Sequence, residues 1–315
     1  MKPFIAISDR KKGSIIALVA TILFSNVYIF SKAALNEISL PKFLFYWFAI
    51  AFSINLIISW QKGDFQQLKK LKLKEYRIFL LLGIIEIVTT TTFYIALNTI
   101  PDPAVTSLLG NMFVVFLVLL GVILLKERFT RIESVGVIIT ILGAFAVGYK
   151  GGHSIKDFFV AGTGMVMINT FTAAVSSIVA KKAVEKHSPT IINLNRTLFM
   201  FVFGLSYFLL SKESLLIPIS ALKNILIGVV LGPITGILMI YTSYKYIEAS
   251  RSSVFQGLKG VFVLIGAYIY FNTLPGTIQL IGGFGSIIGV MIMTLSKAKL
   301  LSWNRTKTDA STPLD

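Results

Sequence analysis

Hydrophobic residues occur in long runs along the whole chain, and charged residues fall mainly between these runs. A helix needs about 20 mostly apolar residues to cross the hydrocarbon core of a bilayer, which is roughly 30 Å thick. Ten runs have about this length, and charged residues, prolines or glycines bound each of them. The pattern predicts an all-α integral membrane protein with ten transmembrane helices, over residues 14–35, 42–60, 77–97, 104–125, 132–149, 158–180, 190–210, 222–244, 252–271 and 276–296.

Composition supports this class of protein. The 315-residue chain is 55% hydrophobic and 14% charged, with a mean hydropathy of +0.80, whereas soluble domains are about 25% charged. The absence of cysteine excludes disulfides, thiolate metal sites and a cysteine nucleophile. The formal net charge of +16 does not indicate a nucleic-acid partner, because the cytoplasmic loops of membrane proteins are themselves rich in Lys and Arg.

The basic residues are divided unequally between the two sides of the predicted bundle. Most of the 30 Lys and Arg residues lie in the N-terminal segment, in the C-terminal tail and in the loops on the same side as these ends. Short loops rich in Lys and Arg remain cytoplasmic. Both termini are therefore predicted to be cytoplasmic.

The two halves of the chain resemble one another. Residues 13–41 line up with residues 162–189, and this alignment places Lys32 opposite Lys181. Each half then contains five predicted helices. Because five is odd, the second half must cross the membrane upside down relative to the first, as in many secondary transporters.

A second stretch supports the same division, since residues 104–143 overlay residues 249–289, with Gly136 opposite Gly282. We therefore expect two inverted five-helix repeats between short cytoplasmic ends. The predicted segments are 1–13 (N-terminus), 14–149 (first repeat), 150–296 (second repeat) and 297–315 (tail).

Several stretches also carry a family resemblance. Three stretches resemble the EamA-type family of drug/metabolite transporters: ATILFSNVYIFSKAAL in the first span, TFYIALNTIPDPAVTSLL from the end of the third and VILLKERFT from the end of the fourth. The similarity extends from about residue 13 to 296. The second helix of this family often carries an Arg. Trp47 occupies that position here, whereas Arg196 is present at the matching position of the second half. The resemblance implies a secondary transporter of a small metabolite, with export as the preferred direction, in a bacterial-type inner membrane.

Three ionisable residues lie inside predicted spans: Glu86, Arg196 and Lys259. Such residues are costly in a membrane, and they commonly face a cavity and pair with one another. All three lie several residues into outward-running spans, so we expect them in one layer. A pair between Glu86 and either base leaves one positive charge, which suits a carboxylate or phosphate on a solute. The alternative is an ion pair that only holds helices in register.

Other polar residues follow these charges at helical spacing. Thr90 and Tyr94 lie four and eight residues after Glu86, and Gln256 lies three residues before Lys259. Residues at these spacings share one helix face, so each set predicts a stripe that lines a polar pathway.

Two asparagines lie near the centres of their spans, Asn26 in the first and Asn169 in the sixth. The repeat alignment places them close together, so we expect a pseudo-symmetric pair that lines the same pathway. The alternative is ordinary hydrogen bonding between helices, worth about 0.6 kcal/mol for each residue.

The chain has no nucleotide-binding motif, so transport would draw on a gradient. Glu86 is the candidate for a coupling proton, because carboxylates within membrane spans commonly relay protons. His153 and His187 fall in opposite loops and cannot readily share a metal, and we expect no metal and no cofactor. The glycine-rich run at residues 282–289 predicts close helix packing or a homodimer face.

Two other classes of function compete with transport. A membrane enzyme acting on lipids needs acid, base or metal groups clustered together, and the spans contain a single carboxylate. A scaffold or receptor that transports nothing has little need for polar residues within its spans. Transport of a small, amino-acid-like or anionic solute is therefore the favoured function.

Overall fold

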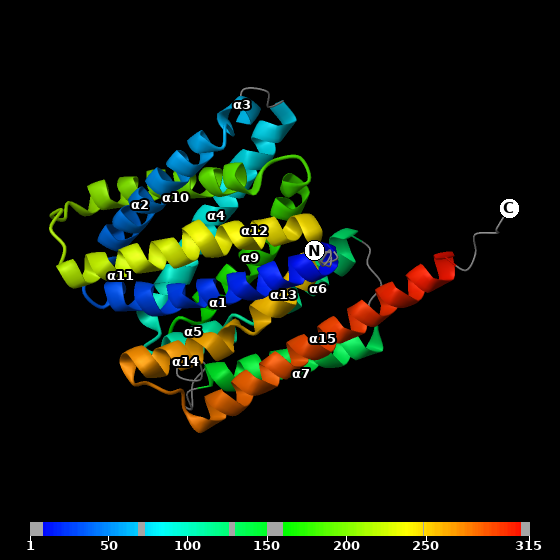
Figure 1. Cartoon of the computed structure of the whole chain (residues 1–315). Coiled ribbons are helices and arrows are strands. Elements are labelled where there is room, and N and C mark those ends of the chain that lie inside the picture. Colours follow the sequence, from blue (N-terminus) through cyan, green and yellow to red (C-terminus); the bar gives the residue numbers. More distant parts are fainter. Residues whose placement is uncertain (1–8, 69–72, 126–129, 150–159, 248, 310–315) are drawn as a thin grey trace, which may run out of the picture.

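The computed structural model of the chain describes residues 9–68, 73–125, 130–149, 160–247 and 249–309 (Figure 1). These residues form helices and connecting turns, with no strand among them. The helices are α1 (Asp9–Leu35), α2 (Leu40–Gln61), α3 (Phe65–Leu68), α4 (Leu73–Thr99), α5 (Pro103–Leu109), α6 (Met112–Leu125), α7 (Arg131–Gly148), α9 (Thr163–Val184), α10 (Pro189–Ser211), α11 (Ile219–Val229), the π-helical turn η1 (Val230–Gly236), α12 (Ile237–Tyr246), α13 (Ala249–Gly257), α14 (Lys259–Phe271) and α15 (Thr277–Asp309).

The described residues contain eight stretches that are long and apolar enough to cross a membrane. They are formed by α1, α2, α4, α5 with α6, α7, α9, α10 and α11 to α12. Two shorter apolar helices, Phe255–Phe271 and Thr277–Met293, lie where the ninth and tenth spans are predicted. The structure therefore supports a multi-pass helical membrane protein, and the count of ten spans and the sidedness of the termini stay predictions.

Three of the predicted spans are interrupted. The fourth breaks at Gly110 and Asn111, between α5 and α6, and the ninth breaks at Leu258, between α13 and α14. The eighth contains the turn η1, at whose centre lies Pro233. Proline has no backbone N–H and its ring clashes with the preceding helical turn, which accounts for the wider turn at this point.

The helices pack as extended antiparallel pairs from opposite halves of the chain. α1 lies along α11, η1 and α12, while α4 lies along α9, α2 along α10 and α7 along α15 (Figure 1). Contacts between α1 and α4, and between α9 and α12, are few by comparison. Each pair therefore joins one helix of the first half to one of the second.

Glycines bring α7 and α15 into backbone contact. A Cβ atom at Gly143 would lie 2.5 Å from the carbonyl oxygen of Gly282, and one at Gly289 would lie 2.6 Å from the carbonyl oxygen of Gly136. Only glycine permits such an approach between helices. Gly282 and Gly289 therefore pack against α7 within the chain, and a homodimer through another face of α15 stays a prediction.

Side-chain hydrogen bonds join the ends of α2 and α10. The hydroxyl of Ser39, which precedes α2, donates to Glu213 Oε2 at 2.5 Å, just beyond the end of α10. The hydroxyl of Ser188, which precedes α10, donates to Asp64 Oδ1 at 3.0 Å, just beyond the end of α2. These polar contacts fix the register of the antiparallel pair at both ends.

Candidate functional site

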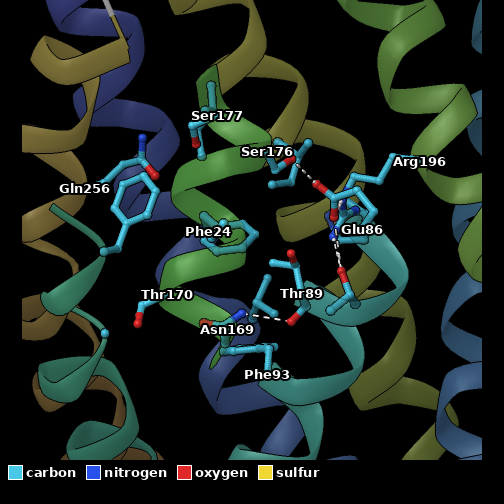
Figure 2. A pocket seen from close by; sticks show the side chains of 18 of the residues that line it. Phe24, Glu86, Thr89, Phe93, Asn169, Thr170, Ser176, Ser177, Arg196 and Gln256 are labelled. Atoms are coloured by element: carbon cyan, nitrogen blue, oxygen red, sulfur yellow. Dashed lines mark hydrogen bonds and ion pairs between the residues drawn. The ribbon is translucent and has the colours of Figure 1, made fainter. Parts of the chain in front are cut away.

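A cavity of about 130 Å³ lies among α1, α4, α9, α12 and the junction of α13 with α14 (Figure 2). It is bounded on one side by the α1 and α12 pair and on the other by the α4 and α9 pair. The predicted site residues that line it are Glu86, Thr90, Tyr94, Asn169, Arg196, Gln256 and Lys259. Helices far apart in the sequence thus bring nearly all of the predicted set together.

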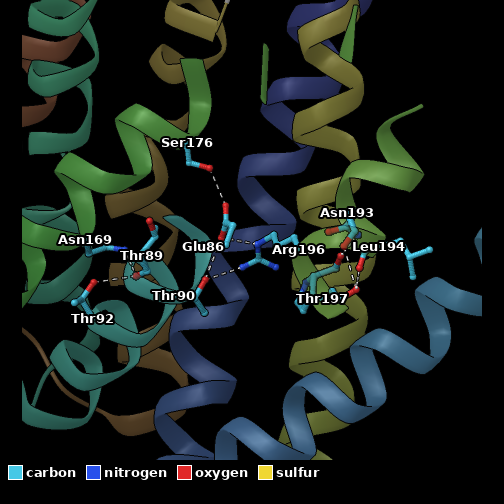
Figure 3. A network of polar contacts seen from close by, with 11 residues as sticks. Glu86, Thr89, Thr90, Thr92, Asn169, Ser176, Asn193, Leu194, Arg196 and Thr197 are labelled. Atoms are coloured by element: carbon cyan, nitrogen blue, oxygen red, sulfur yellow. Dashed lines mark hydrogen bonds and ion pairs between the residues drawn. The ribbon is translucent and has the colours of Figure 1, made fainter. Parts of the chain in front are cut away.

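Glu86 and Arg196 form a buried ion pair in the cavity wall (Figure 3). Arg196 Nε donates to Glu86 Oε2 at 2.9 Å, and Arg196 Nη2 donates to the hydroxyl of Thr90 at 3.3 Å. The hydroxyl of Ser176, from α9, donates to Glu86 Oε1 at 2.9 Å. Both oxygens of the carboxylate are therefore occupied, and the pair is electrically neutral.

Arg196 still has an unused donor. Its Nη1 atom is buried and has no hydrogen-bond partner among the described residues. The guanidinium carbon lies 5.9 Å from the centroid of the Phe48 ring, which covers one side of the group. Because an unpaired buried donor is costly, this atom favours an acceptor at the site.

Lys259 is the first residue of α14, directly after the break that follows α13. Its ammonium lies 5.2 Å from the ring centroid of Tyr28 and 5.9 Å from that of Phe24, both on α1. No acidic side chain within the described residues pairs with it. Cation–π contacts are worth about 0.5–2 kcal/mol, less than an anionic partner would supply in a site shielded from water.

The cavity therefore holds one acidic and two basic residues. With Glu86 and Arg196 neutralising one another, Lys259 leaves the lining with one net positive charge. The sequence predicted this excess of one positive charge from residue types alone, and the structure shows that Arg196 is the base that pairs with Glu86.

The two central asparagines have different roles. Asn169 lines the cavity, and its Nδ2 donates to the backbone carbonyl of Thr89 on α4 at 2.8 Å (Figures 2 and 3). Asn26 is not part of the lining, because its amide donates to the carbonyl of Ile22, one turn earlier in its own helix, at 3.0 Å. The structure thus does not form the expected pair of Asn26 with Asn169, and Asn26 is removed from the candidate site.

Tyr94 and Gln256 line the cavity as predicted and have contrasting surroundings. Tyr94 is buried in an aromatic cluster, with ring centroids 4.8 Å from Phe43 and 5.8 Å from Trp47. Gln256 is more open and donates to the hydroxyl of Ser252 at 3.4 Å. Trp47 is fully buried and packs within this aromatic cluster.

Apart from Tyr94, sequence reasoning missed the aromatic part of the lining. Phe24, Tyr28, Phe93 and Phe113 all border the cavity. Phe24 and Tyr28 are four residues apart on α1, which places them on one helix face, but rings within an apolar span give no distinctive pattern. The lining combines charged and polar side chains with aromatic rings, an arrangement typical of sites for small organic molecules.

No group of three or more His, Asp or Glu side chains that could hold a metal occurs among the described residues. His187 Nε2 lies 3.7 Å from Glu75 Oε1 at the ends of α9 and α4, outside the cavity. His153 lies outside the described residues.

The chain is similar to known transporters over nearly its whole length. The model of the EamA-like transporter family matches twice, over residues 11–149 and 160–295. An uncharacterized transporter of Archaeoglobus fulgidus is 24% identical over 286 residues, which is 90% of this chain and 98% of the relative. An uncharacterized transporter of Methanothermobacter thermautotrophicus is 24% identical over 236 residues, or 74% of this chain and 68% of the relative.

A solved structure described only as the crystal structure of a protein has the same fold. It superposes with a TM-score of 0.69 at 14% identity, covering 92% of this chain and 99% of that one. At this identity the likeness concerns the fold alone. With the family match across both halves, the apolar helices and the central polar cavity, the chain belongs to the EamA-like transporter family.

Proposed function

We propose that this protein is a secondary transporter that carries a small solute with an anionic group, including amino-acid-like zwitterions, through the central cavity by alternating access. The observation that carries this proposal is Lys259, a base that lines the cavity without an acidic partner among the described residues. A carboxylate or phosphate on the solute supplies the missing counter-charge. Export from the cytoplasm across a bacterial-type inner membrane is the proposed direction.

The remaining lining suits the rest of such a solute. Arg196 Nη1 offers a second donor, and Asn169, Thr170 and Gln256 provide neutral hydrogen-bonding groups. The aromatic rings of the lining favour a solute with an apolar or planar body. A neutral or cationic solute would leave Lys259 unpaired, so these classes are disfavoured.

The contacts between halves support ten spans arranged as two inverted repeats. In the sequence alignment, Gly136 lies opposite Gly282 and Gly143 opposite Gly289, while the structure places Gly136 against Gly289 and Gly143 against Gly282. Exchanging the two halves turns each contact into the other, as a two-fold axis in the membrane plane requires. The two separate matches to the family model agree with this division, and cytoplasmic termini remain the proposed orientation.

Thermal unfolding in detergent tests the solute class. The purified protein is screened against amino acids, organic acids and sugar phosphates, because a ligand that binds only the folded state stabilises it by about 2.7 kcal/mol at 100 times its Kd. An anionic or zwitterionic compound should raise the unfolding temperature of the wild type. Lys259→Ala should lose the shift, and Lys223→Ala, which removes an exposed lysine on α11, should keep it. Stabilisation only by neutral or cationic compounds would contradict the proposal.

The proposed coupling ion is a proton carried by Glu86. During the transport cycle the carboxylate would release Arg196 and bind the proton in its place. Transport into proteoliposomes under an imposed pH gradient tests this step. Glu86→Gln should abolish acceleration by the gradient, whereas Glu185→Gln, at an exposed position after α9, should not. Normal gradient-driven transport by Glu86→Gln would assign the carboxylate to structure alone.

A further inference from the structure

Lys32 makes an unusual contact near the end of α1. Its side chain is buried, and its Nζ donates to the backbone carbonyl oxygens of Leu97 at 2.9 Å, Asn98 at 3.2 Å and Ile100 at 2.9 Å. These carbonyls belong to the end of α4, where a helix has no N–H groups left to satisfy them. A cation at this end is also favoured by the helix dipole. Lys32, on α1, therefore caps the C-terminal end of α4.

Lys181 makes the corresponding contact in the second half. Its Nζ donates to the carbonyl oxygen of Tyr244, in the last turn of α12. Lys181 lies near the end of α9, and the sequence alignment places it opposite Lys32. The two lysines thus perform the same capping contact at equivalent positions of the two halves.

The two contacts lie at opposite ends of the bundle. Lys32 is at the end of α1 that is distant from the N-terminus. The end of α12 lies beside the start of α1, since the ammonium of Lys12 is 4.6 Å from the ring centroid of Tyr246. Figure 1 shows α12 at the same end of the bundle as the N-terminus. The cavity lies between the two contacts.

Each lysine also joins helices that otherwise touch little. α1 packs along α12, and α4 packs along α9, so the cavity separates two helix pairs. Lys32 reaches from α1 to α4, and Lys181 reaches from α9 to α12. Both contacts therefore cross from one pair to the other, one at each end of the cavity.

The capped helix ends are continuous with the cavity wall. Tyr94 lines the cavity one turn before Leu97, and Tyr244 lines the cavity with its side chain while its carbonyl accepts from Lys181. Moving either helix end therefore moves an aromatic side chain of the lining.

We propose that Lys32 and Lys181 are the two gate residues of the transporter. Lys32 closes the path to the face opposite the N-terminus, Lys181 closes the path to the face that carries it, and transport releases one contact at a time. This inference rests on the proposed alternating access and is independent of which solute is carried.

The absence of cysteine provides a clean background for testing sided access. Ala173→Cys introduces one thiol at a small residue of the cavity lining. Intact cells and inverted membrane vesicles expose opposite faces to a membrane-impermeant thiol reagent, and a cleavable N-terminal tag identifies the face that carries the N-terminus. Labelling rates are then compared in the parent, in Lys32→Met and in Lys181→Met.

Lys32→Met should speed labelling from the face opposite the N-terminus by about tenfold or more, since losing a charge-assisted hydrogen bond shifts an opening equilibrium by at least about that factor. Lys181→Met should do the same from the N-terminal face only. Lys223→Met and Lys182→Met remove exposed lysines near the respective ends and should leave both rates unchanged. Lys182 directly follows Lys181, so it controls for loss of charge at that position.

Unchanged labelling in both gate variants, or acceleration from both faces by each of them, would overturn the inference, because a purely structural cap gives no sidedness. If Lys32→Met does not fold, Lys32→Gln retains an uncharged N–H donor group and should give the same sidedness at a smaller factor. Labelling needs no solute. A failed ligand screen with sided labelling would therefore reject the proposed solute class while supporting the gates.

Discussion

The ion pair of Glu86 with Arg196 gives a quantitative prediction. Glu86 is 6% exposed and Arg196 is 9% exposed, and their bond of 2.9 Å is the principal compensation for two buried charges. Removing one partner of such a pair costs about 3–5 kcal/mol, because the other charge remains buried without compensation. The pair borders a cavity, so we expect the lower end, about 3 kcal/mol, for either Glu86→Gln or Arg196→Met.

The double variant Glu86→Gln with Arg196→Met should be much less harmful than the sum of the single changes. Neither charge then remains in the site, and replacing a whole buried pair by uncharged groups of similar volume is often nearly neutral. Reversible unfolding of the four proteins in mixed detergent micelles, followed by circular dichroism, gives the coupling free energy of the double-mutant cycle. If each single variant lost less than about 0.5 kcal/mol of unfolding free energy and the double variant lost only their sum, the reasoning would be refuted. Such a result would show that water in the cavity already screens the pair.

Three further predictions concern packing and helix ends. Gly289→Ala should lower the free energy of unfolding by about 1–3 kcal/mol, because its Cβ would meet the carbonyl oxygen of Gly136. Gly285→Ala on the same helix has open space and should leave that free energy unchanged. Equal losses in the two variants would contradict the contact between α7 and α15. Ser188→Ala should cost about 1 kcal/mol of unfolding free energy through loss of the cap of α10, and an unchanged stability would contradict that role. Burial raises the pKa of Asp102 above 3.8, so its contribution to stability falls as pH rises from that value towards the folded pKa. Asp102→Asn keeps the cap of α5 and does not titrate, so its unfolding temperature should rise relative to that of the wild type as pH rises across this interval. A difference in unfolding temperature that does not change with pH would contradict the raised pKa.

The sequence was sufficient to place most helices and to single out the charged residues that line the cavity. Long apolar runs define the spans, and an acid or base within such a run is so costly that Glu86, Arg196 and Lys259 stand out without any structure. Their convergence on one cavity follows from helices of opposite halves packing together.

The errors have specific physical causes. Asn26 sits centrally in its span, but an asparagine can satisfy its amide with a carbonyl one turn earlier, so a central position does not ensure a place in a cavity. The break at Gly110 and Asn111 lies inside an apolar run, where hydrophobicity alone gives no sign of a turn. The contacts of Lys32 and Lys181 depend on which helix end each side chain meets, which no local pattern encodes.

Movement of a solute through the cavity is the most direct test of the whole account. The compound that most stabilises the protein is radiolabelled and followed by counterflow in proteoliposomes, for the wild type, Lys259→Ala and the control Lys223→Ala. We predict saturable counterflow of an anionic or zwitterionic compound by the wild type and the control, with loss in Lys259→Ala. Counterflow that persists unchanged in Lys259→Ala, or that is confined to neutral or cationic compounds, would contradict the account.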